Sequence, residues 1–251
     1  MKALWLGLLS FATILTLWEA AARLGVMNPF FTSQPSAIAA TLGEEARSGE
    51  LPRNITVSLG EFAAGYGAAV FIGIFLGVLA GRFRTFEYAL DPFLWFLYSA
   101  PLVALFPIFI IWFGLGARPV IAIAFLLSVT PIAANTLSGI KGINPALVRA
   151  AKSFGAGESD LLWKVILPAS VPMVIAGLRL GIGRALTGVV VGELFGATAG
   201  LGFSIAYYGG LLKTTNMLAS LAVIAVLGVV CTQGLSAVEA RLDSWRTGPG
   251  L

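Results

Sequence analysis

The stretch from Asn144 to Pro168, NPALVRAAKSFGAGESDLLWKVILP, decides how the rest of the chain is organised. It is the longest polar interruption in the second half of an otherwise apolar sequence. Asn144 suits the N-cap of a helix, and Pro145 suits its first position. Gly155 stands where a helix favours a left-handed glycine after its last residue. Between these signals, apolar residues at i, i+3, i+4 and i+7 predict one face of a short helix: Leu147, Ala150, Ala151 and Phe154.

A second short amphipathic segment is expected from about residue 158 to residue 166, and Pro168 is expected to end it. Charged side chains keep the whole stretch in water: Arg149, Lys152, Glu158, Asp160 and Lys164. Two short, exposed helices joined by a turn are typical of a docking element for a partner protein.

The composition places the rest of the chain in a membrane. Hydrophobic residues make up 58% of the sequence and charged residues 11%, with a mean hydropathy of +0.91. Soluble domains carry roughly a quarter of charged residues, so the solvent around this chain is lipid. The net charge of +4 is not gathered into a basic stripe, which excludes a nucleic-acid partner.

Several kinds of chemistry are excluded by missing residue types. The chain has no histidine and one cysteine, Cys231, so it cannot form an internal disulfide, a Cys/His zinc site or a His-based catalytic triad. The nearest match to a phosphate-binding loop, from Gly209 to Thr214, lacks the Gly-Lys step. We therefore expect no cofactor, no bound nucleotide and no enzymatic activity in this chain.

Apolar runs predict an all-α polytopic protein with a single transmembrane domain over residues 1–251. Since a helix needs about 20 residues to cross a bilayer, we expect six spans, at residues 4–22, 57–81, 86–113, 119–139, 171–196 and 217–238, with a polar loop at 140–170. The first run also fits a signal peptide loosely, although Glu19 is poorly suited to one.

Lysine and arginine placement predicts the orientation, because cytoplasmic loops are enriched in both. One side of the six-span topology holds nine of them: Lys2, Arg82, Arg84, Lys141, Arg149, Lys152, Lys164, Arg241 and Arg246. The other side holds five: Arg23, Arg47, Arg53, Arg118 and Lys213. The loop at 140–170 and both termini are therefore expected in the cytoplasm.

Small residues and prolines mark particular spans. The second span has a small residue at every fourth position, which predicts close helix packing either within the chain or against a second copy: Gly65, Ala69, Gly73, Gly77 and Gly81. The third span contains Pro92, Pro101 and Pro107. These prolines indicate either an irregular helix that lines a pathway or a kinked structural helix.

Polar residues inside the spans are the candidates for the transport pathway. Arg184 lies 13 residues after Val171, about 20 Å along a straight helix. A charge at the bilayer centre costs on the order of 2.5–3.5 kcal/mol. Arg184 therefore either contributes positive potential to an anion path or pairs with backbone carbonyls or a buried acid, such as Glu193 of another copy. Glu193 itself is a candidate for a cap of the following glycine-rich segment, an outer gate or a hydrogen-bond anchor, and the weaker candidates are Tyr98, Ser99 and Asn135.

One motif in the loop resembles that of a known family. The run Arg149-Ala150-Ala151-x-x-x-Gly155, followed after nine residues by Val165-x-Leu167-Pro168, is similar to the EAA loop of ABC importer permeases. Arg149 replaces the name-giving glutamate, so the family's salt bridge at that position is not carried over, and Val165 replaces the usual isoleucine. Three further segments resemble the nitrate/sulfonate/taurine type, and the likeness covers roughly 200 of the 251 residues: 54–83, 99–116 and 183–203.

The resemblance implies an ABC type I importer-like permease in the bacterial inner membrane. It implies two copies of this chain, or one copy and a related permease, with two ATPase subunits that bind ATP and an extracytoplasmic binding protein. It further implies that the loop is a cytoplasmic coupling helix with these contact residues: Arg149, Ala150, Ala151, Phe154, Gly155, Leu167 and Pro168. The expected substrate is a small anion such as nitrate, a sulfonate or taurine. The alternative, a stand-alone ion-coupled secondary transporter, predicts internal repeats and acidic or histidine relays, and neither is evident in the sequence.

Overall fold

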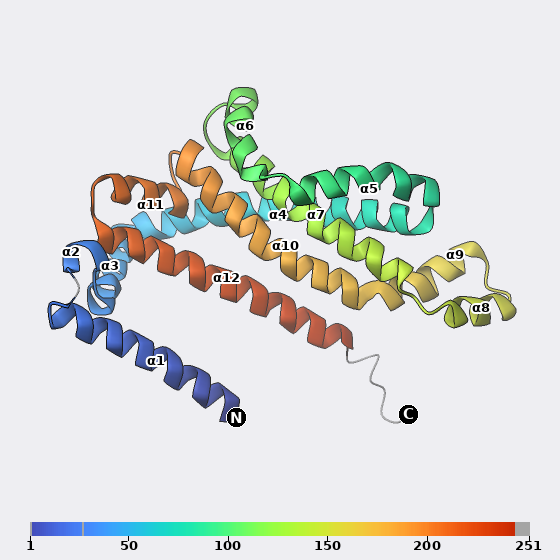
Figure 1. Cartoon of the computed structure of the whole chain (residues 1–251), viewed down its shortest axis with the longest axis horizontal. Coiled ribbons are helices and arrows are strands. Elements are labelled where there is room, and N and C mark those ends of the chain that lie inside the picture. The colour runs from blue at the N-terminus through green and yellow to red at the C-terminus, as the bar shows by residue number, and fades with distance from the viewer. Residues whose placement is uncertain (1, 27, 244–251) are drawn as a thin grey trace.

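The computed structural model describes residues 2–26 and 28–243, and every regular element within them is a helix (Figure 1). In chain order the elements are α1 (Lys2–Arg23), α2 (Pro29–Thr32), α3 (Pro35–Ser48), α4 (Glu50–Arg82), α5 (Arg84–Ser99), the 3-10 turn η1 (Leu102–Leu105), α6 (Phe106–Phe113), α7 (Ala117–Lys141), α8 (Pro145–Ser153), α9 (Glu158–Leu161), the π-turn η2 (Leu162–Ile166), α10 (Leu167–Gly196), α11 (Leu201–Gly210) and α12 (Thr214–Asp243). The all-α polytopic class expected from the sequence is confirmed.

The centre of the fold is α7, which packs between α4 and α10. Residues on several sides of α7 are fully buried, including Ile123, Ala124 and Ile132. A helix that is apolar all round belongs in the interior of a bundle, and α7 has this character. The long helices run along the longest axis of the molecule, with α8 and α9 at one end and α2, α3 and α11 at the other (Figure 1).

The small residues of α4 pack against α7 of the same chain. A Cβ added at Gly77 would lie 2.5 Å from the Cβ of Thr136 and 2.7 Å from the carbonyl oxygen of Ala133. Helix α10 approaches α7 just as closely, because a Cβ at Gly188 of α10 would lie 2.7 Å from the Cα of Ala124. The two interpretations left open by the sequence are thus resolved, because this ladder serves close packing within the chain.

The third expected span, 86–113, is bent in the structure, in keeping with the irregular or kinked helix that its prolines indicate. It divides into α5 and the pair η1–α6, which meet at an angle of 91°. Ala100, the residue before Pro101, is extended, with φ −73° and ψ 141°, because the proline ring disfavours helical backbone in its predecessor. Five helices are long and apolar enough to cross a membrane, and the described residues hold six spans if the bent pair counts as one.

The expectation that Pro168 ends a helix is wrong. Helical backbone continues from Glu158 to Gly196, and Pro168 lies in the first turn of α10. The π-turn η2 immediately precedes it, where the N–H of Leu167 donates to the carbonyl of Leu162, five residues back. Since the hydrogen-bond pattern changes at this point, the missing N–H of the proline leaves the helix unbroken.

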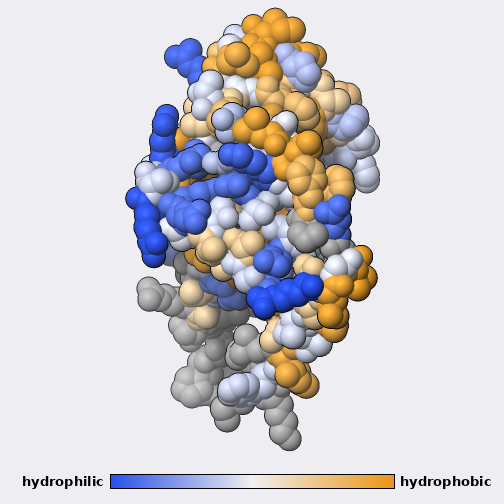
Figure 2. All heavy atoms as spheres, turned by 90° about the vertical axis from the view of Figure 1, so that its left-hand side faces the viewer, coloured by the Kyte–Doolittle hydropathy of each residue, from blue (hydrophilic) through white to orange (hydrophobic). Residues whose placement is uncertain are grey.

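The end of the molecule that carries α3 and α11 differs from its sides. Figure 2 looks directly at that end of the molecule. Hydrophilic side chains gather across the middle of the view, and hydrophobic side chains lie at the top and along the right-hand side. This distribution is typical of a polar membrane face bordered by surfaces that meet lipid.

Candidate docking loop and transport pathway

Helix α8 has defined caps at both ends. The side chain of Asn144 accepts a hydrogen bond of 2.9 Å from the N–H of Ala146. At the other end, Gly155 is left-handed with φ +81°. The N–H of Gly155 donates to the carbonyl of Lys152 at 3.0 Å, and the N–H of Ala156 donates to that of Ala151 at 3.1 Å. This is the Schellman arrangement, so both cap predictions are confirmed.

One side of α8 is fixed to the rest of the protein. Ala151 and Val148 pack against a small cluster formed by Ile140, Leu161 and Ile166. Glu158 forms ion pairs with Arg82 at the end of α4 and, at 3.5 Å, with Lys152 of α8. These contacts hold the loop against the ends of α4, α7 and α10.

The other side of α8 is exposed. The side chain of Phe154 is 93% exposed and that of Leu147 is 52% exposed. Arg149 and Ala150 are exposed as well. The four apolar residues predicted to share one face therefore do not all face the same way. Ala151 packs inward, whereas Leu147, Ala150 and Phe154 are exposed.

Leu167 and Pro168 lie apart from α8. Both are half-buried at the base of α10. With Trp163 they line a separate apolar hollow of about 330 Å³ between α4 and α10. The coupling residues predicted from the sequence therefore lie at two separate places: one set is exposed on α8, and Leu167 and Pro168 lie at the base of α10.

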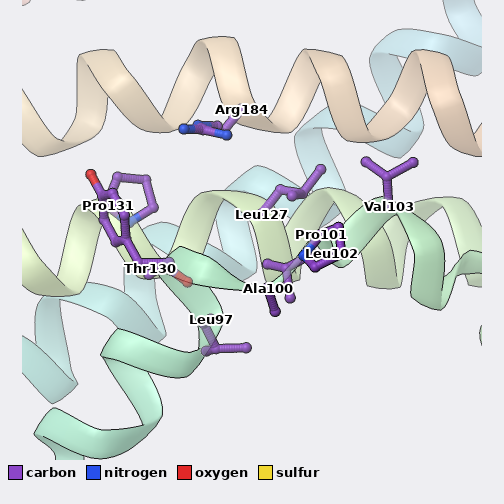
Figure 3. Close-up of a pocket in the computed structure, with 10 residues that line it drawn as sticks. Leu97, Ala100, Pro101, Leu102, Val103, Leu127, Thr130, Pro131 and Arg184 are labelled. Atoms are coloured by element: carbon purple, nitrogen blue, oxygen red, sulfur yellow. The ribbon is translucent and has the colours of Figure 1, made fainter.

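A cavity of about 230 Å³ lies where α5 ends and η1 begins. Arg184, near the middle of α10, lies on one side of it, with Thr130 and Pro131 of α7 on another (Figure 3). Tyr98 also lines it. No ion pair or hydrogen bond of the Arg184 side chain occurs among the described residues, so its guanidinium group remains available.

The remaining pathway candidates are placed differently. Asn135 lines a neighbouring cavity of about 390 Å³ together with Asp91 and Tyr98, and its amide donates to the carbonyl of Pro131 at 2.8 Å. Ser99 lines neither cavity, and its hydroxyl donates to the carbonyl of Trp95 in its own helix at 2.8 Å. The structure thus brings Tyr98 to both cavities.

Glu193 lies on the far side of α10 from these cavities, and only 1% of it is exposed. Its carboxylate accepts hydrogen bonds of 2.6 Å from the hydroxyl of Ser58 and from the N–H of Gly202. A buried group cannot form an outer gate or pair with Arg184 of another copy. Of the roles considered, two agree with the structure: the carboxylate caps the first turn of α11 through the N–H of Gly202, and it is a hydrogen-bond anchor that joins α10 to α4 and to α11.

Polar residues on α4 that sequence reasoning missed complete this buried network. Asn54 donates to the hydroxyl of Ser204 at 2.8 Å and accepts from the N–H of Gly200 at 3.1 Å. Glu61 is 4% exposed, and its carboxyl group lies against that of Glu193. The signal was present in the sequence as polar side chains at helical spacing before an apolar run: Asn54, Ser58 and Glu61.

Comparisons with known proteins agree with this architecture. Residues 69–244 match the model of the family described as "Binding-protein-dependent transport system inner membrane component". The taurine transport system permease protein TauC of Escherichia coli K12 is 34% identical over 239 residues, which cover 93% of this chain and 87% of that protein. The putative aliphatic sulfonates transport permease protein SsuC of Bacillus subtilis 168 is 33% identical over 240 residues, 96% of this chain and 87% of that protein.

Solved structures show the same fold. An inward-facing structure of the MetNI methionine ABC transporter superimposes with a TM-score of 0.68 at 19% identity, covering 79% of this chain and 98% of that chain. A second structure, of an amino acid ABC transporter with histidines, gives a TM-score of 0.58 at 16% identity, covering 79% and 96%. The chain therefore belongs to the binding-protein-dependent transport system inner membrane components, and it is a multi-pass permease subunit of an ATP-driven importer rather than an enzyme or an ion-coupled carrier.

Proposed function

We propose that α8 is the coupling helix through which this permease receives work from an ATPase subunit. The observation that supports this is the exposed apolar surface of α8, formed by Leu147 and Phe154 on a helix with fixed caps. A phenylalanine that is 93% exposed on a polar loop outside the spans is costly to leave in water. An apolar helix face of this kind suits a groove on a partner.

A second copy of this chain completes the assembly. Arg184 is exposed on the surface of the single chain near the middle of α10. A charge facing lipid at that depth costs on the order of 2.5–3.5 kcal/mol, so protein or water must cover it. Pairing two permease chains across this face would enclose a pathway between them, with Tyr98 and Asn135 along it.

The orientation follows from charge and topology. Helices α8 and α9 face the cytoplasm, where lysine and arginine are enriched. Helix α1 runs toward the end that carries α2 and α3, and α12 runs away from that end toward α8 and α9 (Figure 1), so each helix has its terminal side directed away from the α3 and α11 end, as expected if both termini are cytoplasmic. The polar end that carries α3 and α11 then faces outward and would receive the binding protein (Figure 2).

The substrate we propose is a small anion such as nitrate, a sulfonate or taurine. Support comes from the unpaired Arg184 beside the cavity and from relatives named for taurine and aliphatic sulfonates. ATP, bound by two partner subunits, would draw the two coupling helices together. The permease would then change from inward-open to outward-open, the binding protein would release its ligand, and hydrolysis would reset the cycle.

The decisive experiment measures ATP hydrolysis by the full complex in nanodiscs, with its ATPase subunit and ligand-loaded binding protein. Phe154→Asp should abolish the stimulation of hydrolysis by the binding protein, because it places a charge in the docking surface. Ser153→Ala is the matched control, since this neighbouring exposed hydroxyl bonds only to the carbonyl of Arg149 in its own helix. Unchanged stimulation in Phe154→Asp, or substrate uptake without any ATPase subunit, would refute the proposal.

A further inference from the structure

Two carboxyl groups meet inside the bundle, where α4 packs against α10 and α11. Glu61 of α4 is 4% exposed and Glu193 of α10 is 1% exposed, and their carboxyl groups lie against each other. Helices of this chain alone enclose them, so the site needs no second copy to be complete. Two negative charges held side by side away from water repel strongly, so both groups cannot be ionised in this arrangement.

The hydrogen bonds around the pair leave one carboxyl group without a donor. Glu193 accepts from the hydroxyl of Ser58 and from the N–H of Gly202, each at 2.6 Å. The N–H groups of the two residues before Gly202 donate elsewhere, to Asn54 and to Ser58. The Oε2 atom of Glu61 has no hydrogen-bond partner among the described residues. An ionised Glu61 would be buried beside another carboxylate without any donor, whereas a protonated Glu61 can donate to Glu193.

Within the part of the chain that the structure describes, no positive charge neutralises the pair. Neither carboxyl group takes part in an ion pair there. From α7 the neighbouring side chain is apolar, because Val120 packs on Gly192 next to Glu193. The other charged or titratable groups on this side of the bundle have different surroundings: Arg53 lines an open hollow with Glu50, Glu50 accepts from Tyr208 of α11, Glu45 of α3 accepts from Asn216 of α12, and Cys231 of α12 and Tyr66 of α4 pack against one core cluster.

The backbone beside the pair suits a proton better than a metal ion. Gly200 has φ +116°, and a Cβ at Gly202 would lie 2.8 Å from the Cβ of Glu193, so the chain approaches the carboxylate closely at this turn. The turn presents N–H groups to the site, whereas hard metal cations are bound by oxygen atoms. Among the described residues, no group of three or more acidic, histidine or cysteine side chains could hold a metal ion.

We infer that Glu61 and Glu193 form a proton-binding site in which the two carboxyl groups share one proton. The protonated pair ties α4 to α10 and, through the N–H of Gly202, holds the first turn of α11. When this end of the bundle loosens and water enters, both groups ionise, the proton passes to water, and the two carboxylates repel each other. Closing therefore takes up one proton and opening releases it, so the pair is a proton-dependent latch.

The test is hydrogen exchange of the full-length permease in nanodiscs, followed by mass spectrometry of the segment 197–206. Protection is expressed relative to the exchange rate of an unstructured peptide of the same sequence at the same pH, which removes the intrinsic effect of pH. If opening releases one proton, protection should fall by up to about ten-fold per pH unit between about pH 6 and pH 8. In Glu61→Gln, protection should not depend on pH, because the amide donates to Glu193 without an added proton. Exchange is measured locally because Glu45 also contributes to the pH dependence of overall stability.

Glu44→Gln is the matched control, since it removes an exposed carboxylate from α3 at the same end of the molecule. It should keep the pH dependence of the unmodified chain. Protection that is independent of pH in the unmodified chain, or equally dependent on pH in Glu61→Gln, would overturn the shared proton. Protection that changes with sodium concentration at constant pH would assign the site to a metal ion and overturn it as well. The assay needs no ATPase subunit, binding protein or substrate, so its failure is distinguishable from failure of the proposed function.

Discussion

Gly77 provides a stringent test of how α4 and α7 pack. In Gly77→Ala, the added methyl carbon would lie 2.5 Å from the Cβ of Thr136 and 2.7 Å from the carbonyl oxygen of Ala133. Non-bonded carbon atoms prefer separations of about 3.5–4.0 Å, so the two helices must move apart by about 1 Å. One of the opposing atoms belongs to the backbone and cannot rotate away.

The expected cost lies toward the upper part of the range for overpacking, about 2–3 kcal/mol, because separation loosens contacts along the whole helix pair. For a chain of this size the loss corresponds to a melting temperature lower by roughly 5–10 °C. Gly67→Ala is the matched control on the same helix, since nothing lies within 4 Å of the added carbon. It should leave the melting temperature unchanged or slightly higher, because alanine favours a helix over glycine.

The measurement is the melting temperature of each purified variant in the same detergent, followed by tryptophan fluorescence, with the oligomeric state determined by light scattering. Equal melting temperatures for Gly77→Ala and Gly67→Ala would refute the close packing described above. A change in oligomeric state at unchanged melting temperature would show instead that this face of α4 contacts a second copy.

Three further predictions concern other parts of the chain. Glu193→Ala should lower the melting temperature strongly, because it leaves the hydroxyl of Ser58 and a backbone N–H unpaired, at about 1–3 kcal/mol for each; an unchanged value would contradict the anchor role. Burial raises the pKa of Glu45 above its ordinary value of 4.5, so the folded state keeps a proton that the unfolded chain loses. Stability should therefore fall as pH rises through the raised pKa, and Glu45→Gln should remove this dependence in melting curves recorded against pH. Asn144→Ala should destabilise α8 by about 1 kcal/mol and speed hydrogen exchange at the amide of Ala146, with exchange in α7 as the internal reference.

Features set by neighbouring residues were predictable from the sequence. The N-cap at Asn144 and the left-handed Gly155 depend on local backbone preferences, and both are found in the structure. The long helices follow from apolar runs of membrane-spanning length. The family resemblance came from a motif with fixed spacing, which needs no tertiary information.

Features set by distant residues were not predictable. Pro101 coincides with a 91° break between α5 and the η1–α6 pair, whereas the helical hydrogen bonding continues past Pro168. The difference arises because Pro168 follows a π-turn, which could not be predicted from the sequence. Glu193 could not be assigned a single role, since its partners on α4 lie more than a hundred residues away in the chain. The inward turn of Ala151 depends on a cluster contributed by α7, α9 and η2, which periodicity within α8 cannot reveal.

The unbroken helical course from Glu158 to Gly196 has a mechanical consequence. Its straight part is α10, whose 30 residues extend over about 45 Å at a rise of about 1.5 Å per residue, while α9 turns away from this line at η2 (Figure 1). Helix α10 follows η2, which contacts α8, is packed against α7, and ends near the Glu193 anchor. A rigid helix that pivots near its middle moves its two ends in opposite directions, so a tilt of about 10° displaces each end by about 4 Å. Closure at one membrane face would then be opening at the other, as one rigid movement that requires no separate signal between them.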